Sequence, residues 1–151
     1  MAALAPDLVV VKLPCTEAGL TAAAALRVQG VRVTITAIYA AQQMLLAQAV
    51  GAEYAAPYLA RMESALGEGK GFAEVVRMAR IAAATGSSTR VLVASIRNAS
   101  DLALLSAEGC DTFTFSPAVA EQLFCLEATE RAAADFEAAA ARNAGKPAGS
   151  G

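Results

Sequence analysis

The chain has 151 residues, of which 56% are hydrophobic and 17% are charged, and its formal net charge is −2. This length predicts one domain with enough apolar material for a core, so a disordered chain is not expected. The small net charge, the absence of tryptophan and the lack of a basic stripe argue against a nucleic-acid surface. The apolar runs are far shorter than the roughly 18 residues of a membrane span, so we expect no membrane partner either.

Histidine is absent and cysteine occurs three times. The lack of histidine excludes His-based triads and His-ligated zinc sites, which leaves carboxylates, tyrosine, lysine, cysteine or water for acid–base chemistry. An odd number of cysteines without metal-like spacing predicts a reducing compartment, so we expect a cytoplasmic protein without a disulfide framework. Residues 1–7 show neither the basic region nor the cleavage pattern of a secretory signal.

The first predicted element is a strand over residues 8–11, directly followed by Lys12. Its β-branched residues do not alternate with polar ones, which is typical of a strand buried on both faces. Thr16 is expected to cap the helix that follows. Gly30 is expected to close that helix in the left-handed conformation.

Strands and helices continue to alternate along the chain. Further strands are expected over residues 31–36, 54–57, 91–95 and 112–115. Further helices are expected over about 40–50, 72–86, 98–109, 118–124 and 129–143. The glycines at 67, 69 and 71 are expected in a loop, and they lack the spacing of a dinucleotide fingerprint. Residues 144–151 are small and polar, so we expect a disordered tail after a single domain over residues 1–143.

This order of elements predicts an α/β fold with a parallel sheet of about five βα units. Polar residues follow the strands, which is where (β/α) barrels of the TIM type place their active sites. These residues are Lys12, Thr36, Tyr58, Ser95 and Arg97. A complete barrel has eight units and usually at least about 200 residues, so we expect a partial barrel. A doubly wound domain that binds a small ligand is the geometric alternative.

The first strand would form an uncovered apolar edge of this sheet. An exposed apolar edge promotes aggregation, so we expect that a second chain covers it or that a longer gene encodes further units. Burial would disfavour the charged form of Lys12 and supply a neutral amine able to attack a carbonyl. The alternative is a lysine that guards the sheet edge or extends its amine to solvent. The nearby Cys15 is expected to be a buried, inert thiol.

Several segments resemble the transaldolase family, which includes fructose-6-phosphate aldolase. They are residues 10–20 (VVKLPCTEAGL), 33–39 (VTITAIY), 43 (Q), 51–54 (GAEY), 56–61 (APYLAR) and 93–98 (VASIRN). They follow one another with family-like spacing, and the resemblance fades after Phe115. They correspond to strands four to eight of the family barrel, without its three N-terminal βα units. Thr34, Ala56 and Tyr58 are similar to the smaller, aldolase-like branch of the family.

The resemblance implies a class I aldolase or transaldolase that acts on phosphorylated ketoses such as fructose 6-phosphate. It would cleave or transfer a dihydroxyacetone unit in carbohydrate metabolism, including the pentose phosphate pathway. Lys12 would form the Schiff base, and Thr36 and Tyr58 would hold the water that moves protons. No metal or other cofactor is implied. The family's C-terminal helix packs on neighbouring subunits, which implies a homo-oligomer.

The substrate phosphate would be held by Arg61, Ser95 and Arg97, which suits the match between guanidinium groups and phosphate oxygens. Arg61 could instead be a solvated arginine before a helix, and Thr36 and Tyr58 could be packing residues of the barrel. Glu63 stands where the family usually has aspartate, and no role is assigned to it. The functional alternative is a catalytically inactive barrel fragment that serves as a phosphate-binding or subunit-packing module.

Overall fold

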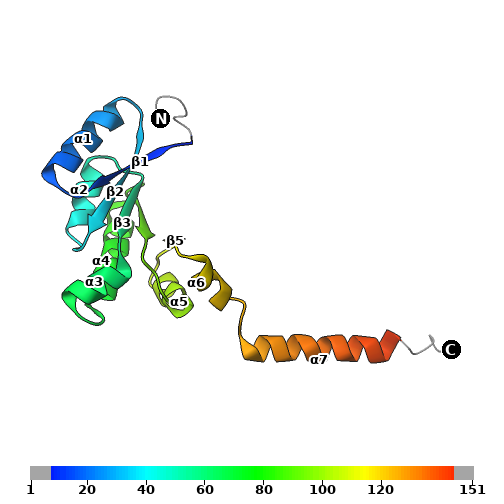
Figure 1. The fold of residues 1–151 in the computed structure, drawn as a ribbon. Helices are drawn as coiled ribbons and strands as arrows, with labels where there is room; N and C mark the ends of the chain where they lie inside the picture. Colours follow the sequence, from blue (N-terminus) through cyan, green and yellow to red (C-terminus); the bar gives the residue numbers. More distant parts are fainter. Residues whose placement is uncertain (1–7, 145–151) are drawn as a thin grey trace.

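The structure, a computed structural model, describes residues 8–144 (Figure 1). In chain order its elements are β1 (Val10–Pro14), α1 (Glu17–Val28), β2 (Arg32–Ile38), α2 (Gln43–Ala49), β3 (Tyr54–Pro57), α3 (Leu59–Leu66), α4 (Lys70–Thr85), β4 (Arg90–Val93), α5 (Ala99–Ala107), β5 (Thr112–Phe113), α6 (Pro117–Gln122) and α7 (Glu127–Ala144). Residues 145–151 of the expected tail lie outside the described residues, and Ala144 belongs to α7.

The five strands form one parallel sheet in the order β1-β2-β3-β4-β5. Each strand pairs with the next one along the chain, as in the wall of a (β/α) barrel. A doubly wound sheet instead reverses its strand order at a switch point. The partial barrel of about five units is therefore confirmed, and the doubly wound alternative is wrong.

The core lies between the sheet and its helices. Val33 and Ile35 of β2 are fully buried, together with Met44 of α2, Met62 of α3 and Met78 of α4. Alternate residues of a strand point to opposite faces. Val33 and Ile35 therefore share one face, while Thr34 and Thr36 share the other. The apolar side of β2 holds the helices in place and leaves its threonines on the other face of the sheet.

The first strand differs from the sequence-based expectation. β1 extends to Pro14, so Lys12 lies inside the strand, and Leu8 lies before it with 85% of its surface exposed. Val10 and Val11 are only half-buried because β1 is the edge of the described sheet. The prediction of a strand buried on both faces was wrong for this part of the chain. The prediction of an open edge is confirmed for the described residues.

Other boundaries also differ. The helix α3 was missed, because its eight residues are too few for a clear periodic pattern. β4 ends at Val93 and β5 at Phe113, each two residues earlier than expected. Gly71 lies within α4 and not in the loop. The capping predictions hold: Thr16 accepts a hydrogen bond from the Gly19 amide at 3.1 Å, and Gly30 has φ +79°.

Gly71 allows α3 and α4 to pack closely. A Cβ atom at this position would lie 2.7 Å from the backbone nitrogen of Glu63 and 2.9 Å from Cβ of Met62. Glu63 Oε1 accepts a hydrogen bond from the Phe72 amide at 2.6 Å, which satisfies one of the free N–H groups at the start of α4. Glu63 thus has a structural role that the sequence did not reveal.

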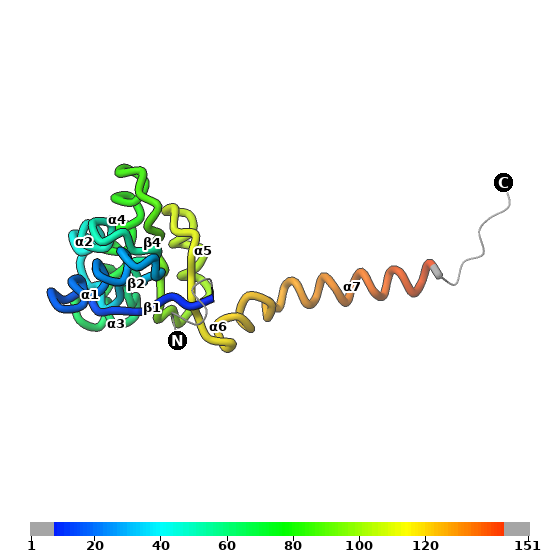
Figure 2. Tube along the Cα trace, turned by 90° about the horizontal axis from the view of Figure 1, so that it is seen from above, coloured from blue at the N-terminus to red at the C-terminus, as the bar shows by residue number. Residues whose placement is uncertain are grey.

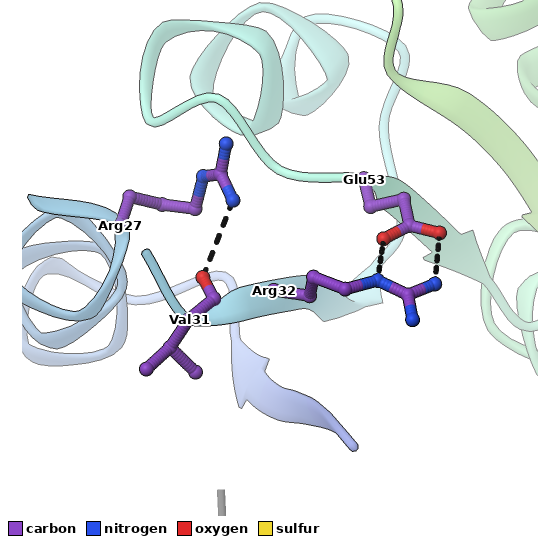
Figure 3. A network of polar contacts seen from close by, with 4 residues as sticks. All are labelled: Arg27, Val31, Arg32 and Glu53. Carbon is purple, nitrogen blue, oxygen red and sulfur yellow. Dashed lines mark hydrogen bonds and ion pairs between the residues drawn. The ribbon is translucent and has the colours of Figure 1, made fainter. Parts of the chain in front are cut away.

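An ion pair and a hydrogen bond to the backbone lie near the starts of β2 and β3. Arg32 makes two hydrogen bonds to the Glu53 carboxylate, at 2.5 and 2.6 Å, and Arg27 donates to the Val31 carbonyl at 3.3 Å (Figure 3). The hydrogen bonds from Arg32 are the main reason why the pKa of Glu53 is lowered. This bidentate ion pair joins the start of β2 to the residue before β3.

Replacing Glu53 with glutamine is expected to lower the free energy of unfolding by roughly 1 kcal/mol at neutral pH, because the pair is partly solvent-screened. A lowered folded-state pKa contributes stability that is present above the unfolded value of about 4.3 and is lost as pH falls through the folded value. Urea unfolding between pH 7 and pH 3 should therefore show that the free energy of unfolding falls less with decreasing pH in E53Q than in wild type. The control E108Q removes the more exposed pair with Arg80 and should change less. Equal pH profiles for wild type and E53Q would contradict this expectation.

The last helix projects away from the rest of the molecule. Both views show α7 extending beyond α6 without packing on the sheet or on the other helices (Figures 1 and 2). Nearly all of its described side chains are exposed. Among the helices of residues 8–144, none combines the length and hydropathy needed to span a bilayer.

Candidate active site

Strand register brings the candidate catalytic residues to one face of the sheet. Lys12 pairs with Thr34 across β1 and β2, and Thr36 pairs with Ala56 across β2 and β3. Residues two apart in a strand share a face, so all four side chains lie on the same side. Tyr58 follows β3 and reaches back to this face, where its hydroxyl oxygen accepts a hydrogen bond from Thr36 Oγ1 at 2.6 Å.

Tyr58 is the centre of the cluster. Lys12 Nζ lies 5.3 Å from the centroid of its ring, and Cζ of Arg61 lies 4.7 Å from the same centroid. The hydrogen bond from Thr36 and the nearby cations Lys12 and Arg61 together lower the pKa of the Tyr58 phenol, against the opposing effect of burial. A phenol with these neighbours releases a proton more readily and can exchange protons with a bound water.

A β-bulge lies directly after Thr36. Thr36 pairs with Ala56, whereas Ile38 pairs with Pro57, so Ala37 is the extra residue on β2. Ala37 has φ +55°, a conformation that is unfavourable for a residue with a side chain. Ser95 has φ +62° at the end of β4. Such strain is often found at functional sites, and local sequence patterns gave no signal for it at either position.

The three candidate phosphate ligands lie at the ends of β3 and β4. Tyr58 forms a parallel bridge with Ala94, and the Ala60 amide donates to the Ser95 carbonyl at 3.2 Å. These contacts place the start of α3, which carries Arg61, beside Ser95. Arg97 is exposed and lines a cavity of about 500 Å³ with Ala60 and Glu63, a cavity whose lining does not include Lys12. Arg61 thus lies beside the ring of Tyr58, whereas Arg97 lies in the lining of the neighbouring cavity.

Lys12 is not buried in the described part of the chain. Its side chain is exposed on the open face of β1, because no strand of residues 8–144 lies beyond this edge. The desolvation expected from the sequence is therefore absent here. Cys15 is half-buried, and burial raises the pKa of its thiol, which agrees with the prediction of an inert cysteine.

Replacing Thr36 with valine is expected to raise the pKa of Tyr58 toward its ordinary value, because the largest cause of the lowering is the Thr36 hydrogen bond. Valine keeps the β-branched shape that suits the strand. The change is measured by titrating tyrosinate absorbance, with Y58F used to subtract Tyr39 and Tyr54. The control T21V removes a hydroxyl from the exposed surface of α1 and should leave the titration unchanged. An identical Tyr58 titration in T36V and wild type would contradict the assigned role of the hydrogen bond.

Comparisons with known proteins identify the family of the chain. The profile of the family described as Transaldolase/Fructose-6-phosphate aldolase matches residues 1–147. The chain belongs to this family. It is similar to a probable transaldolase from Desulfitobacterium hafniense, with 35% identity over 130 residues that cover 86% of this chain and 60% of that protein. It is also similar to a probable fructose-6-phosphate aldolase from Streptococcus pneumoniae, with 35% identity over 133 residues, 87% of this chain and 59% of that protein.

This transaldolase-family chain therefore spans about 60% of the length of these curated relatives. Among solved structures it is similar to a GMP reductase from Trypanosoma brucei, with a TM-score of 0.56 and 15% identity. That match covers 73% of this chain and 28% of the reductase. At this identity the likeness concerns the fold alone.

Proposed function

We propose that this transaldolase-family chain carries the Schiff-base half of an aldolase or transaldolase active site for phosphorylated ketoses. The observation that carries the proposal is the cluster in which Lys12 and Arg61 both contact Tyr58, while Thr36 donates to its hydroxyl. The curated relatives named as transaldolase and fructose-6-phosphate aldolase support the choice of reaction class. The proposal includes a reducing, cytoplasmic compartment, which the free thiols of Cys15, Cys110 and Cys125 support.

In the proposed reaction, Lys12 Nζ attacks the ketose carbonyl and loses water to form an iminium. The iminium withdraws electrons, so the bond between the carbons α and β to it can break. The β-carbon leaves as the aldehyde when its hydroxyl loses a proton, and the three-carbon unit stays on the lysine as an enamine. A water held by Thr36 and Tyr58 accepts the proton from the substrate hydroxyl and returns one to the enamine. Water then hydrolyses the iminium to release dihydroxyacetone and the free Lys12 amine; in transfer, the enamine instead attacks an acceptor aldehyde before hydrolysis. The lowered pKa of Tyr58 favours this exchange.

Arg61, Ser95 and Arg97 are proposed to hold the substrate phosphate. Both arginines are exposed and can offer guanidinium N–H groups to an oxyanion. The strained Ser95 lies two residues before Arg97 in the chain and next to the start of α3, which carries Arg61. The ring of Tyr58 contacts the Arg61 guanidinium, which would link phosphate binding to the proton-transfer group.

The test is conversion of fructose 6-phosphate by the chain, followed as release of glyceraldehyde 3-phosphate. Release without an acceptor indicates aldol cleavage, and turnover only with an added aldehyde acceptor indicates three-carbon transfer. Because Lys12 is exposed in residues 8–144, we expect slow turnover until the open face of β1 is covered. A folded protein that neither converts fructose 6-phosphate nor forms an imine would refute the catalytic proposal.

The exposed α7 supports a second role, in subunit packing. Leu123, Phe124 and Leu126 before the helix and Phe136 within it are exposed, at 46, 77, 58 and 76%. An apolar surface of this kind marks a protein–protein contact, and we propose a second copy of the chain as its partner. Light scattering should then report an oligomer. The variant F124S/F136S should reduce its mass, and the control V28S, at an exposed valine of α1, should not. A monomeric wild type would contradict this role.

A further inference from the structure

A second cavity, separate from the proposed substrate site, lies between the β2–α2 connection and α4. Its volume is about 600 Å³, within the range of small-molecule sites. It is lined by Tyr39, Ala40, Gln42, Leu66, Lys70, Ala73, Glu74 and Arg77. Lys70, Ala73, Glu74 and Arg77 occur at helical spacing, so one face of α4 forms a wall of this cavity, which we call the Lys70 cavity.

The hydrogen-bonding groups of the Lys70 cavity are mostly donors. Its one carboxylate among the described lining residues, Glu74, is already engaged: Oε2 accepts from the Ala41 amide at 2.6 Å, and Oε1 pairs with Arg77. The side chains of Tyr39, Gln42 and Lys70 make no hydrogen bond or ion pair with any residue of the range 8–144. Glu74 offsets the charge of Arg77, so the described lining keeps a net charge of +1, carried by Lys70, together with two neutral donor groups.

The neighbouring cavity that contains Arg97 has the opposite character. Its lining includes the carboxylates Glu63, Glu68 and Asp101 beside one arginine. The lining of that cavity has a net negative charge with Arg97 as its one cation, whereas the lining of the Lys70 cavity has a net positive charge. The Lys70 cavity thus combines a hollow of small-molecule size with a positively charged lining, which favours an anion.

We propose that the Lys70 cavity binds an oxyanion of the phosphate type, either free or carried on a small molecule. Lys70 supplies the net charge, Arg77 can offer the N–H groups that Glu74 does not use, and the Tyr39 hydroxyl and the Gln42 amide supply neutral donors. Leu66, Ala40 and Ala73 offer apolar contact to the carbon part of a ligand. None of these residues belongs to the proposed substrate site, so the inference goes beyond the proposed function and does not depend on it.

The test is a titration of the full chain with inorganic phosphate, and separately with glycerol 3-phosphate, followed by amide NMR at constant ionic strength. We expect saturable chemical-shift changes for amides 39–42 and 66–77. These changes should be distinct from any changes at amides 95–98, which belong to the proposed substrate site. The variant R61M/R97M, which removes the proposed substrate-phosphate arginines, should retain the chemical-shift changes at amides 39–42 and 66–77. Tighter binding of glycerol 3-phosphate would assign the site to phosphorylated molecules, and equal or weaker binding would assign it to the free ion.

Three variants decide the role of the side chains. Removing one charged hydrogen bond in K70M should weaken binding at amides 39–42 by about tenfold or more, and Y39F should weaken it less. The matched control R80M removes an arginine of α4 that lies outside the cavity, and it should bind like wild type. Shifts confined to residues 95–98, an unchanged affinity in folded K70M, or equal weakening in R80M would each overturn the proposal.

Discussion

Replacing Lys12 with methionine is expected to abolish covalent trapping of a ketose by borohydride and to lower any turnover by about a thousandfold or more. Borohydride reduces an imine to a stable amine, so wild-type protein incubated with dihydroxyacetone should gain mass on Lys12. Peptide mass spectrometry identifies the modified residue. Lys70 serves as an internal comparison, because it lies away from the Tyr58 cluster and should stay unmodified.

The variant K12R separates the two interpretations of Lys12. Arginine keeps a positive charge at the edge strand but cannot form an imine. If Lys12 only protects the edge of β1, K12R should behave like wild type in every assay, whereas K12M should aggregate. If Lys12 is the nucleophile, both variants should lose the adduct while K12R stays soluble. Equal labelling of Lys12 and Lys70 in wild type would indicate a nonspecific reaction and would contradict the catalytic role.

Replacing Gly19 with alanine is expected to lower the free energy of unfolding by roughly 2 kcal/mol or more, despite the better helix propensity of alanine. Gly19 is buried in the first turn of α1, directly after the strand that carries Lys12. A Cβ atom there would lie 2.1 Å from the carbonyl oxygen of Pro14. The obstacle is backbone, so the helix or the strand end must move. Urea unfolding at neutral pH measures the loss.

The matched control is Ala22→Ser on the exposed side of the same helix, where one added atom meets solvent. Its effect should stay within about 0.5 kcal/mol. A G19A variant as stable as wild type would show that α1 can shift away from Pro14 at little cost. The close approach of Gly19 to the Pro14 carbonyl would then not determine how α1 packs against the end of β1.

The sequence was sufficient for the succession of elements, except for α3. Apolar runs bounded by glycines predicted the strands, and β3 was placed at its observed bounds, Tyr54–Pro57. Helical spacing between Phe72 and Gly86 predicted α4, because a helix buries one stripe at a regular period. The short α3 was missed, since eight residues between a strand and a glycine-rich loop carry too little periodicity.

The sequence named the residues of the candidate site but did not predict how they are arranged in space. The resemblance named Lys12, Thr36, Tyr58 and Arg61. In the structure, Lys12 of β1, Thr36 of β2 and Arg61 of α3 all lie beside Tyr58. The bulge at Ala37 and the structural role of Glu63 have no local signature, because each depends on a partner segment distant in the chain.

The amino-acid sequence by itself determined the class of fold, the family and the residue types available for chemistry, since these follow from periodicity, motifs and the absence of histidine. Only the tertiary structure decided the environment of those residues. Lys12 follows apolar residues in the chain, yet it is exposed because β1 is the edge of the described sheet. Burial depends on which segments pack against a side chain, and that is a property of the folded arrangement rather than of the neighbours in sequence.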